Sequence, residues 1–279
     1  MQRPAERTYL RYPGADHVLR YLRLAVDGSR EQLVEGLMPV LDDLCDGGGA
    51  LRLGAMGLFA DYVAGNLALQ TVAPDWTVTH DMALHWIGAV PAGLDLEATC
   101  TLVRAGKNNV VSETSLVAPG HGEVGRAYVT FTRIARREGM LGSNPHPVVN
   151  LAEEGERPRR PLDDAVGFRL GTSASGAAHV EFDHDPFIHN SVGAIQGGVV
   201  ALALERATSW AAESRHPGRT YRPVDLHLHY LALGRDGPFQ ARAEVLRDDG
   251  ATVVSRVALV DTGNDDRLLA LGVGTAVPL

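Results

Sequence analysis

The chain has 279 residues, of which 45% are hydrophobic and 22% are charged. This hydrophobic share is enough to build a core, which excludes wholesale disorder, and the length fits two domains or one large domain. The formal net charge of −8 at pH 7 argues against nucleic acid as a partner, because proteins that bind nucleic acid present basic surfaces to the phosphates.

The sequence contains no sign of an oxidised, secreted or membrane-spanning protein. Its two cysteines, Cys45 and Cys100, lie far apart and form no CxxC pair, so we expect neither a disulfide framework nor a zinc–thiolate site. The N-terminal segment lacks the apolar stretch of a secretory signal, and no apolar run approaches the ~20 residues that span a bilayer. We therefore expect a soluble, cytoplasmic protein that contacts no membrane.

The chain contains an internal duplication. Residues 45–90 align with residues 189–234 at a constant offset of 144 and without a gap. After one deletion in the next turn, residues 96–117 align with residues 239–260. Identity between the copies is low, but the order and spacing of matched residues hold over more than half of each copy. The sequence therefore predicts two copies of one folding unit.

The duplication sets the expected domain boundaries. We expect one unit over residues 1–134 and a second over residues 165–279. Between them, residues 135–164 are rich in proline, glycine and charged side chains, a composition that cannot bury enough apolar surface to fold alone. This segment is predicted to be a linker.

In the first copy, the hydrophobic pattern predicts a β-hairpin followed by a helix. Residues 18–26 and 33–40 are expected to be the hairpin strands, and residues 52–72 a long apolar helix. Small residues recur every three or four positions in this helix, which lets a sheet close tightly around it. Three strands with alternating apolar residues are predicted after the helix.

The second copy predicts the same elements in the same order. Hairpin strands are expected near residues 165–170 and 177–182, and the helix near residues 196–214. A hairpin, one apolar helix and then antiparallel strands indicate an α+β fold. The helix can be buried in such a fold only if a curled antiparallel sheet wraps around it.

A glycine-rich loop precedes each predicted helix, and an acidic residue lies within the helix. In the second copy the pattern consists of Asn190, Gly193, Gln196, Gly197, Gly198 and Glu205. In the first copy the same positions hold Asp46, Gly49, Arg52, Leu53, Gly54 and Asp61. This spacing resembles that of the PaaI-like (phenylacetate-pathway type) acyl-CoA thioesterases, which have the hotdog fold. Two such units in one chain resemble a double hotdog with pseudo-twofold symmetry.

These residue types suit thioester cleavage. Attack on the carbonyl develops an oxyanion, which free N–H groups at a helix N-terminus stabilise with the helix dipole behind them. Glycines at positions 193, 197 and 198 leave room for a substrate near the backbone. Asn190 and Gln196 are neutral donors that can help to polarise the carbonyl. A carboxylate then acts as general base for water or as nucleophile.

The resemblance implies sites formed across the interface, with the oxyanion donors from one unit and the acid from the other. The complete site would combine Asn190, Gln196 and Gly197 with Asp61 and Thr79, whose hydroxyl matches a Ser/Thr position of the family. The opposite site would combine Asp46 and Arg52 with Glu205, and Pro223 stands where a hydroxyl is needed. Asp46 has the wrong charge for an oxyanion site. We therefore predict one working site and one degenerate site.

Several of these residues also have structural explanations. Asp61 would then be paired with a cation, Asn190 would hold a turn, and Glu205 would form an ion pair, with neighbouring Arg206 or with Arg52. His227 and His229 share a strand face, but the sequence offers no third ligand at a telling spacing, so no metal is expected.

The leading hypothesis is an acyl-CoA or acyl-carrier thioesterase that needs no cofactor beyond the coenzyme A of its substrate. One alternative is a non-catalytic acyl-CoA-binding protein. The other is a hotdog hydratase, whose signature resembles D-x-N-P-L-H. The segment 183–190, DHDPFIHN, departs from that signature by one extra residue and by Asp185 in place of Asn. Homo-oligomers of double hotdogs are expected.

Overall fold

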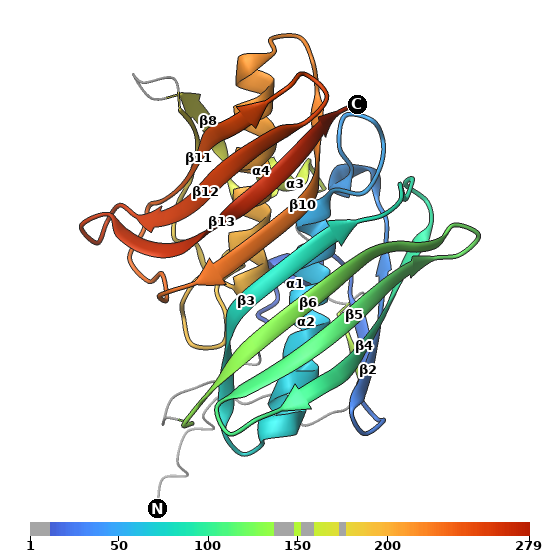
Figure 1. Ribbon diagram of the computed structural model, residues 1–279. Helices are drawn as coiled ribbons and strands as arrows, with labels where there is room; N and C mark the ends of the chain where they lie inside the picture. Colours follow the sequence, from blue (N-terminus) through green and yellow to red (C-terminus); the bar gives the residue numbers. More distant parts are fainter. Residues whose placement is uncertain (1–11, 137–147, 152–158, 173–176) are drawn as a thin grey trace, which may run out of the picture.

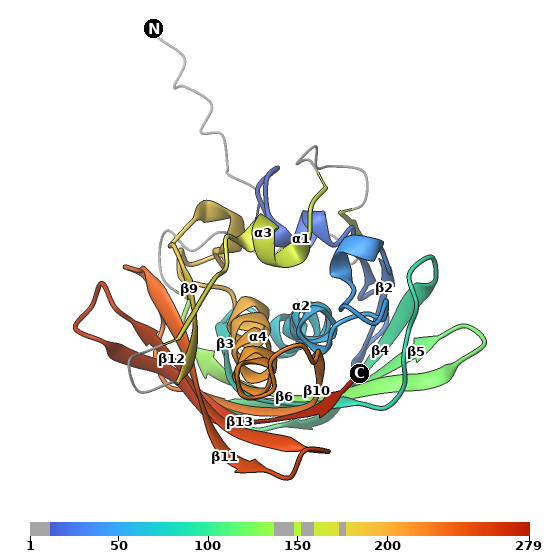
Figure 2. The same ribbon diagram turned by 90° about the horizontal axis from the view of Figure 1, so that it is seen from above.

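The computed structural model describes residues 12–136, 148–151, 159–172 and 177–279. Within these residues, thirteen strands form one antiparallel sheet with the order β7-β1-β2-β4-β5-β6-β3-β10-β13-β12-β11-β9-β8. The sheet curves around two long helices, α2 and α4, which lie side by side in its hollow (Figures 1 and 2). Two short helices, α1 and α3, lie on the open side of the pair (Figure 2).

The two units contain the same elements in the same order. The first contains α1 (Val18–Tyr21), β1 (Ala25–Asp27), β2 (Leu33–Pro39), the 3-10 helix η1 (Asp42–Leu44), α2 (Leu53–Val72), β3 (Trp76–Trp86), β4 (Asp95–Ala105), β5 (Asn109–Ala118) and β6 (Gly122–Ile134). The second contains α3 (Leu162–Val166), β8 (Arg169–Thr172), β9 (Ala178–Phe182), the 3-10 helix η2 (Pro186–Ile188), α4 (Gly197–Arg215), β10 (Tyr221–Tyr230), β11 (Phe239–Asp248), β12 (Val253–Asp261) and β13 (Arg267–Pro278). Between them lies β7 (Val148–Asn150).

The two halves of the sheet join where β3 pairs with β10. These strands are equivalent in the two units and run antiparallel, with Leu84 opposite Leu226 and Met82 opposite Leu228. Pairing a strand with its own repeat in antiparallel orientation generates a pseudo-twofold axis. The order of the other strands is mirrored on either side of this junction. The structure therefore confirms the predicted α+β, double-hotdog architecture.

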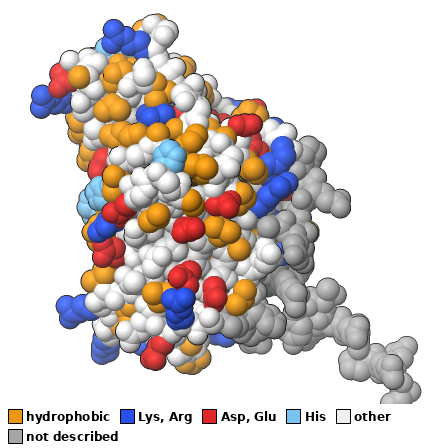
Figure 3. Space-filling view, turned by 90° about the vertical axis from the view of Figure 1, so that its right-hand side faces the viewer, with side chains coloured by type: hydrophobic (Ala, Val, Ile, Leu, Met, Phe, Trp, Pro, Cys, Tyr) orange, Lys and Arg blue, Asp and Glu red, His pale blue; other side chains and the backbone are white. Residues whose placement is uncertain are grey.

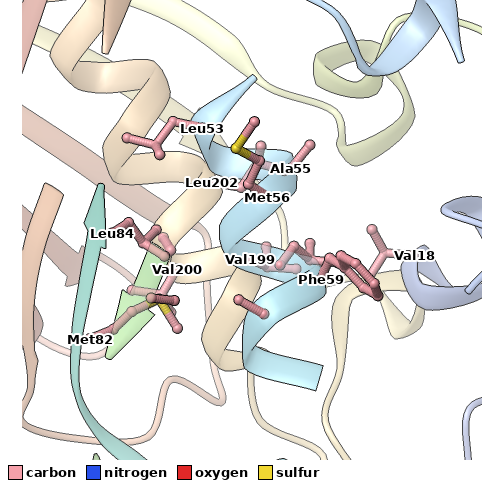
Figure 4. Packing of buried hydrophobic residues seen from close by; sticks show 14 of the residues in the cluster. Val18, Leu53, Ala55, Met56, Phe59, Met82, Leu84, Val199, Val200 and Leu202 are labelled. Atoms are coloured by element: carbon pink, nitrogen blue, oxygen red, sulfur yellow. The ribbon is translucent and has the colours of Figure 1, made fainter. Parts of the chain in front are cut away.

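The two long helices cross at a pair of glycines. A Cβ added to Gly198 would lie 2.5 Å from Leu58 Cα, and one added to Gly54 would lie 3.0 Å from Leu202 Cα. Each helix thus fits a leucine of its partner against its own glycine, and the two contacts are related by the pseudo-twofold axis. Around this crossing, Phe59 of α2, Val199 and Val200 of α4, and Met82 and Leu84 of β3 form part of a shared core (Figure 4).

The predicted ends of the long helices are correct to within a residue. Each helix ends two residues before a proline, Pro74 for α2 and Pro217 for α4. Proline lacks an N–H, and its ring disfavours helical backbone in the residue before it, so neither helix continues.

Two predictions about the strands were wrong. Residues 18–26 were expected to form one strand, but Val18–Tyr21 forms α1, where the His17 side chain accepts a hydrogen bond from Leu19 N–H and all four helix residues are buried. In the second unit Leu162–Val166 likewise forms α3, and the strand begins only at Arg169. An apolar run buried on several sides does not distinguish a short helix from a strand. Four strands, not three, follow each long helix.

The boundaries of the linker remain a prediction. Much of residues 135–164, namely 137–147 and 152–158, lies outside the described residues. In the described part, β7 pairs with the edge strand β1, and α3 already belongs to the elements repeated between the units.

The distribution of charged side chains on the surface agrees with the negative net charge of the sequence. On the face shown in Figure 3, acidic and basic side chains are interspersed with apolar ones, without a broad basic stripe. In the described part of the chain, no helix is both long enough and apolar enough to cross a membrane.

The helix crossing can be tested by Gly54→Ala. The added methyl group would stand 2.7 Å from Leu202 Cδ1 and 2.9 Å from Glu205 Oε2. Overpacking of this kind costs about 1–3 kcal/mol, so the free energy of unfolding in urea should fall by that amount. Gly65→Ala is the matched control in the same helix, because its Cβ would meet Phe131 only at 3.9 Å. The control should keep or slightly raise stability, since Ala favours helix over Gly.

Candidate active site

A cavity of about 380 Å³ lies between the two units. Its walls come from α2 and β3 of the first unit and from the loop before α4 and the end of β10 of the second. All five residues of the complete site predicted from the sequence line it: Asp61, Thr79, Asn190, Gln196 and Gly197. The structure therefore brings together residues that lie up to 136 positions apart in the chain, as Asp61 and Gly197 do.

The Asp61 carboxylate is held in place by three hydrogen bonds. Thr79 Oγ1 donates to Asp61 Oδ1 at 2.9 Å. Gln196 Nε2 and the backbone N–H of Gly198 both donate to Asp61 Oδ2 at 3.0 Å. One of these donors comes from the same unit as Asp61 and two come from the start of α4 in the other unit. The carboxylate is therefore fixed across the interface.

Asp61 is buried, and the described residues supply no counter-ion to it. Its residue is only 6% exposed, and no cationic side chain in the described part of the chain forms an ion pair with it. Burial raises the pKa of Asp61 from 3.8 to about 6, against the hydrogen bonds from Thr79 and Gly198, which lower it. Among the described residues, Asp61 therefore does not form the ion pair that its structural interpretation requires. Near neutral pH, this carboxylate is a stronger base than an exposed aspartate.

Gln196 acts on Asp61 rather than pointing freely into the cavity. Its Oε1 accepts a hydrogen bond from Val199 N–H at 3.1 Å, which caps α4, while its Nε2 donates to Asp61. The reverse amide orientation would place an oxygen against the carboxylate and an NH₂ group against an N–H, so only one orientation satisfies both partners. Gln196 therefore positions Asp61 and also caps the N-terminus of α4.

Gly197, the first residue of α4, presents its backbone to the cavity. Its N–H donates to no partner among the described residues, and it stands at the positive end of a 19-residue helix. A Cβ on Gly197 would lie 2.6 Å from Thr79 Oγ1 and about 3 Å from both oxygens of Asp61. Only glycine fits here, and it places a free donor beside the buried carboxylate.

Asn190 lines the cavity, but its side-chain oxygen holds the loop. Asn190 Oδ1 accepts from the N–H groups of Val192 and Ala194, both at 3.0 Å. Its repeat equivalent Asp46 does the same with Gly48 and Ala50. This shared pattern is that of a loop-forming Asx turn.

Neither Gly193 nor Gly198 lines the cavity. Gly193 has a positive φ of 74° in the turn before α4, as Gly49 has at 75° in the first unit, and glycine adopts this backbone without strain. Gly198 serves the helix crossing and donates its N–H to Asp61. These glycines shape the loop and the helix end rather than a surface that faces a ligand.

At the pseudo-symmetric position, an ion pair replaces the acid–amide contact. Arg52 is the repeat equivalent of Gln196, and Glu205 that of Asp61. Arg52 Nη2 lies 2.6 Å from Glu205 Oε2, and its other terminal nitrogen pairs with Asp163. Arg206, expected as a partner of Glu205, instead pairs with Asp163 at 2.9 Å.

The remaining parts of the second site are also occupied. Glu205 is 2% exposed and Arg52 9% exposed, so the pair is buried within the protein. Asp46 is bound by Arg222, with Nε 2.6 Å from Asp46 Oδ2. Pro223, at the position equivalent to Thr79, supplies no hydroxyl. This arrangement leaves no free carboxylate and fits a structural role.

Tyr230 is a cavity residue that the sequence did not predict. Its hydroxyl donates to the carbonyl oxygen of Gly197 at 2.9 Å, and its ring lines the cavity. Tyr230 ends the strand that aligns with β3, where Trp86 holds the equivalent position. An aromatic residue at this position in both copies was a sequence signal for a shared role. The contact of Tyr230 with the start of α4 could not be predicted from it, because that contact depends on how the sheet curves.

The segment 183–190 does not join the cavity, apart from Asn190 at its end. Asp185 caps η2 by accepting from Phe187 N–H at 2.7 Å, and Asp183 pairs with Arg169 on the surface at 3.0 Å. The rings of His184 and His189 stack at 4.0 Å between centroids. These contacts give local structure and do not favour a hydratase site in this segment.

The chain is similar in sequence to two proteins described as hydrolases or esterases. No protein-family model matches the chain. A Saccharolobus solfataricus protein described as a "putative esterase" is 24% identical over 139 residues, which make up 50% of this chain and 91% of that protein. A 1,4-dihydroxy-2-naphthoyl-CoA hydrolase of Listeria monocytogenes is 27% identical over 101 residues, which make up 36% of this chain and 82% of that enzyme. Each match thus covers most of a relative but half of this chain or less.

A solved structure matches nearly the whole chain. The acyl-ACP thioesterase from Bacteroides thetaiotaomicron covers 89% of this chain and 98% of its own, with a TM-score of 0.58 and 9% sequence identity. At this identity, the likeness establishes the fold shared by the two chains. Both units, and their arrangement in one chain, belong to that shared fold.

The burial of Asp61 predicts a stability difference that depends on pH. In the folded protein its pKa is raised to about 6 from 3.8, so ionisation of Asp61 lowers stability as pH rises between these values. A difference of about two between the folded and unfolded pKa values corresponds to about 3 kcal/mol. Asp61→Asn should therefore be more stable than the unsubstituted chain at pH 7, by up to about 3 kcal/mol.

Urea unfolding at pH 3.5, 5 and 7 measures this difference. At pH 3.5, Asp61 is protonated in the folded state and mostly protonated in the unfolded state, so most of the advantage of Asp61→Asn should vanish. A substituted protein that is equally stable or less stable at pH 7 would contradict the burial of an uncompensated carboxylate.

Proposed function

We propose that this chain is a thioester hydrolase acting on acyl-CoA or acyl-carrier thioesters, of the PaaI-like type in tandem, double-hotdog form. One observation carries the proposal: the buried carboxylate of Asp61 lies beside the Gly197 N–H at the start of α4, and in the described part of the chain neither the carboxylate has a cationic partner nor the N–H an acceptor. A base and an oxyanion donor in one cavity are the two groups that acyl transfer to water requires. The hydrolase and esterase descriptions of the two sequence relatives support this class of reaction.

In the proposed mechanism, the thioester carbonyl oxygen accepts the Gly197 N–H. Asp61 then removes a proton from an attacking water, or attacks the carbonyl itself and forms an anhydride that water hydrolyses. The carbon–sulfur bond breaks as the tetrahedral intermediate collapses, and the sulfur leaves as a free thiol after protonation. The N–H donor and the dipole of α4 stabilise the oxyanion formed in the first step.

The other residues position these two groups. Thr79 and Gln196 hold the Asp61 carboxylate by hydrogen bonds of 2.9 and 3.0 Å, which directs its remaining lone pairs. Asn190 fixes the loop that leads into α4, and Tyr230 fixes the Gly197 peptide from its carbonyl side. The cavity of about 380 Å³ is a place for the acyl group. The proposed enzyme needs no cofactor beyond the substrate's own coenzyme A, and it is expected to be a cytoplasmic homo-oligomer.

The single composite site is tested by comparing Asp61→Asn with Glu205→Gln. Release of free thiol from short, medium, long and aromatic acyl-CoAs is measured for both variants and the unsubstituted chain. Loss of a general base costs about 10²–10⁴-fold, so kcat/KM of Asp61→Asn should fall by that factor. Glu205→Gln removes the equivalent acid of the other unit and should keep kcat/KM within a few-fold.

The other outcomes distinguish the alternatives. A partial and equal loss in both variants, with both proteins folded by circular dichroism, would mean two working sites, whereas a large and equal loss would mean that the two acids share a structural role. Binding of acyl-CoA without thiol release from any substrate would favour the non-catalytic acyl-CoA-binding protein.

The pKa of Asp61 also predicts the pH profile. Only the ionised carboxylate can act as base or nucleophile, so kcat/KM should rise with pH through an apparent pKa of about 6 and then level off. A profile of kcat/KM from pH 4.5 to 8 shows this limb. If the limb lies near pH 4 instead, the essential carboxylate is not the buried one.

A further inference from the structure

Two histidines and one aspartate meet on the outer face of the sheet, at the junction of the two units. His227 and His229 lie two residues apart on β10, so their side chains share a face. Directly opposite His229 on the neighbouring strand β3 is Asp81. The sequence offered no third ligand for this histidine pair, because Asp81 belongs to the other unit and is brought there only by the pairing of β3 with β10.

The three side chains converge on one point. Asp81 Oδ2 lies 3.1 Å from His227 Nε2 and 2.8 Å from His229 Nδ1, and the ligand atoms all lie within 4.8 Å of one another. Both imidazole rings are half exposed, whereas the intervening Leu228 is fully buried and faces the helices. The cluster is thus open to solvent on one side and rests on a rigid, buried sheet on the other.

We propose that Asp81, His227 and His229 bind one divalent transition-metal ion, of the class of Zn²⁺. Two imidazole nitrogens and one carboxylate oxygen suit such an ion, with water in the remaining position, and do not suit Mg²⁺ or Ca²⁺, which prefer all-oxygen ligands. This proposal is independent of the proposed function, because none of the three residues lines the cavity.

The pseudo-symmetric position provides an internal comparison. There, His85 and Asp225 form the equivalent pair, with Nδ1 2.6 Å from Oδ2. The residue equivalent to His227 is Ala83, so this second pair has no third ligand. A site with three ligands holds a divalent ion far better than a site with two, so we expect one metal ion per chain, not two.

The position of the ion would join the two units. Its ligands come from β3 and β10, the strands through which both halves of the sheet are connected. Metal binding to the folded chain stabilises it by mass action. The midpoint of thermal unfolding should therefore rise with added Zn²⁺, and the rise should depend on the three ligands.

The test is titration of the full chain, freed of metal with a chelator, with Zn²⁺ alone in a calorimeter. We expect one ion per chain, and at least tenfold weaker binding in His227→Ala and in Asp81→Asn. His227→Ala introduces the residue that the first unit carries at the equivalent position, and Asp81→Asn keeps the shape of the side chain. The matched control is His85→Ala, which removes a histidine of the two-ligand pair and should leave the affinity unchanged.

A spectroscopic measurement identifies the ligands. Cu²⁺ bound in place of Zn²⁺ should show magnetic coupling to two imidazole nitrogens in the electron paramagnetic resonance spectrum, and to one only in His227→Ala. The proposal is overturned if the unsubstituted chain binds no Zn²⁺, if His227→Ala and Asp81→Asn bind it as tightly as the unsubstituted chain does, or if His85→Ala weakens binding as much as they do. At one Zn²⁺ concentration, the unfolding midpoint of His85→Ala should rise as much as that of the unsubstituted chain, and that of His227→Ala should rise less.

Discussion

The antiparallel pairing of β3 with β10 is the interaction on which the rest of the structure depends. It joins two six-stranded halves into one curved sheet, to which β7 adds an edge strand, and so places α2 and α4 side by side in its hollow. Because the pairing relates the units by a pseudo-twofold axis, the start of each helix meets the middle of the other. Gly54 and Gly198 let the helices approach closely enough for this. Asp61 thereby comes within hydrogen-bond distance of the first turn of α4.

The same geometry has opposite electrostatic consequences at the two positions that the pseudo-twofold axis relates. Gln196 offers Asp61 a neutral amide, whereas Arg52 offers Glu205 a charge at 2.6 Å. A buried carboxylate with a cationic partner is held in an ion pair, and breaking such a pair costs several kcal/mol. A buried carboxylate with neutral donors keeps its basicity at the expense of stability. A duplicated chain can therefore hold an ion pair at one of two equivalent positions and a carboxylate with neutral donors at the other.

The sequence was sufficient for the features that depend on local spacing. The repeat at an offset of 144 predicted the positions of both long helices. The motif spacing predicted the residues that surround Asp61, because a helix N-terminus and the loop before it are local structures. It was insufficient where partners are set by tertiary packing. The apolar segment at 18–26 fits a strand or a helix equally, and burial by the neighbouring elements decided for α1. Arg52 was one of two candidate partners for Glu205, and only the crossing of the helices showed that it, rather than the adjacent Arg206, makes the contact.

Strand alternation explains how one junction can carry two unrelated sets of side chains. Along β10, Leu226 and Leu228 face the helices and His227 and His229 face outward, so substitutions on one face leave the packing of the other intact. Tyr230, at the end of the strand, reaches the Gly197 peptide. The inner face is constrained in both copies, because Met82 and Leu84 of β3 are buried in the core just as Leu226 and Leu228 of β10 are. The outer face is not, which is why Ala83 and His227 could diverge at equivalent positions. A chemical group on that face therefore has to be judged by its own geometry and not by the symmetry of the fold.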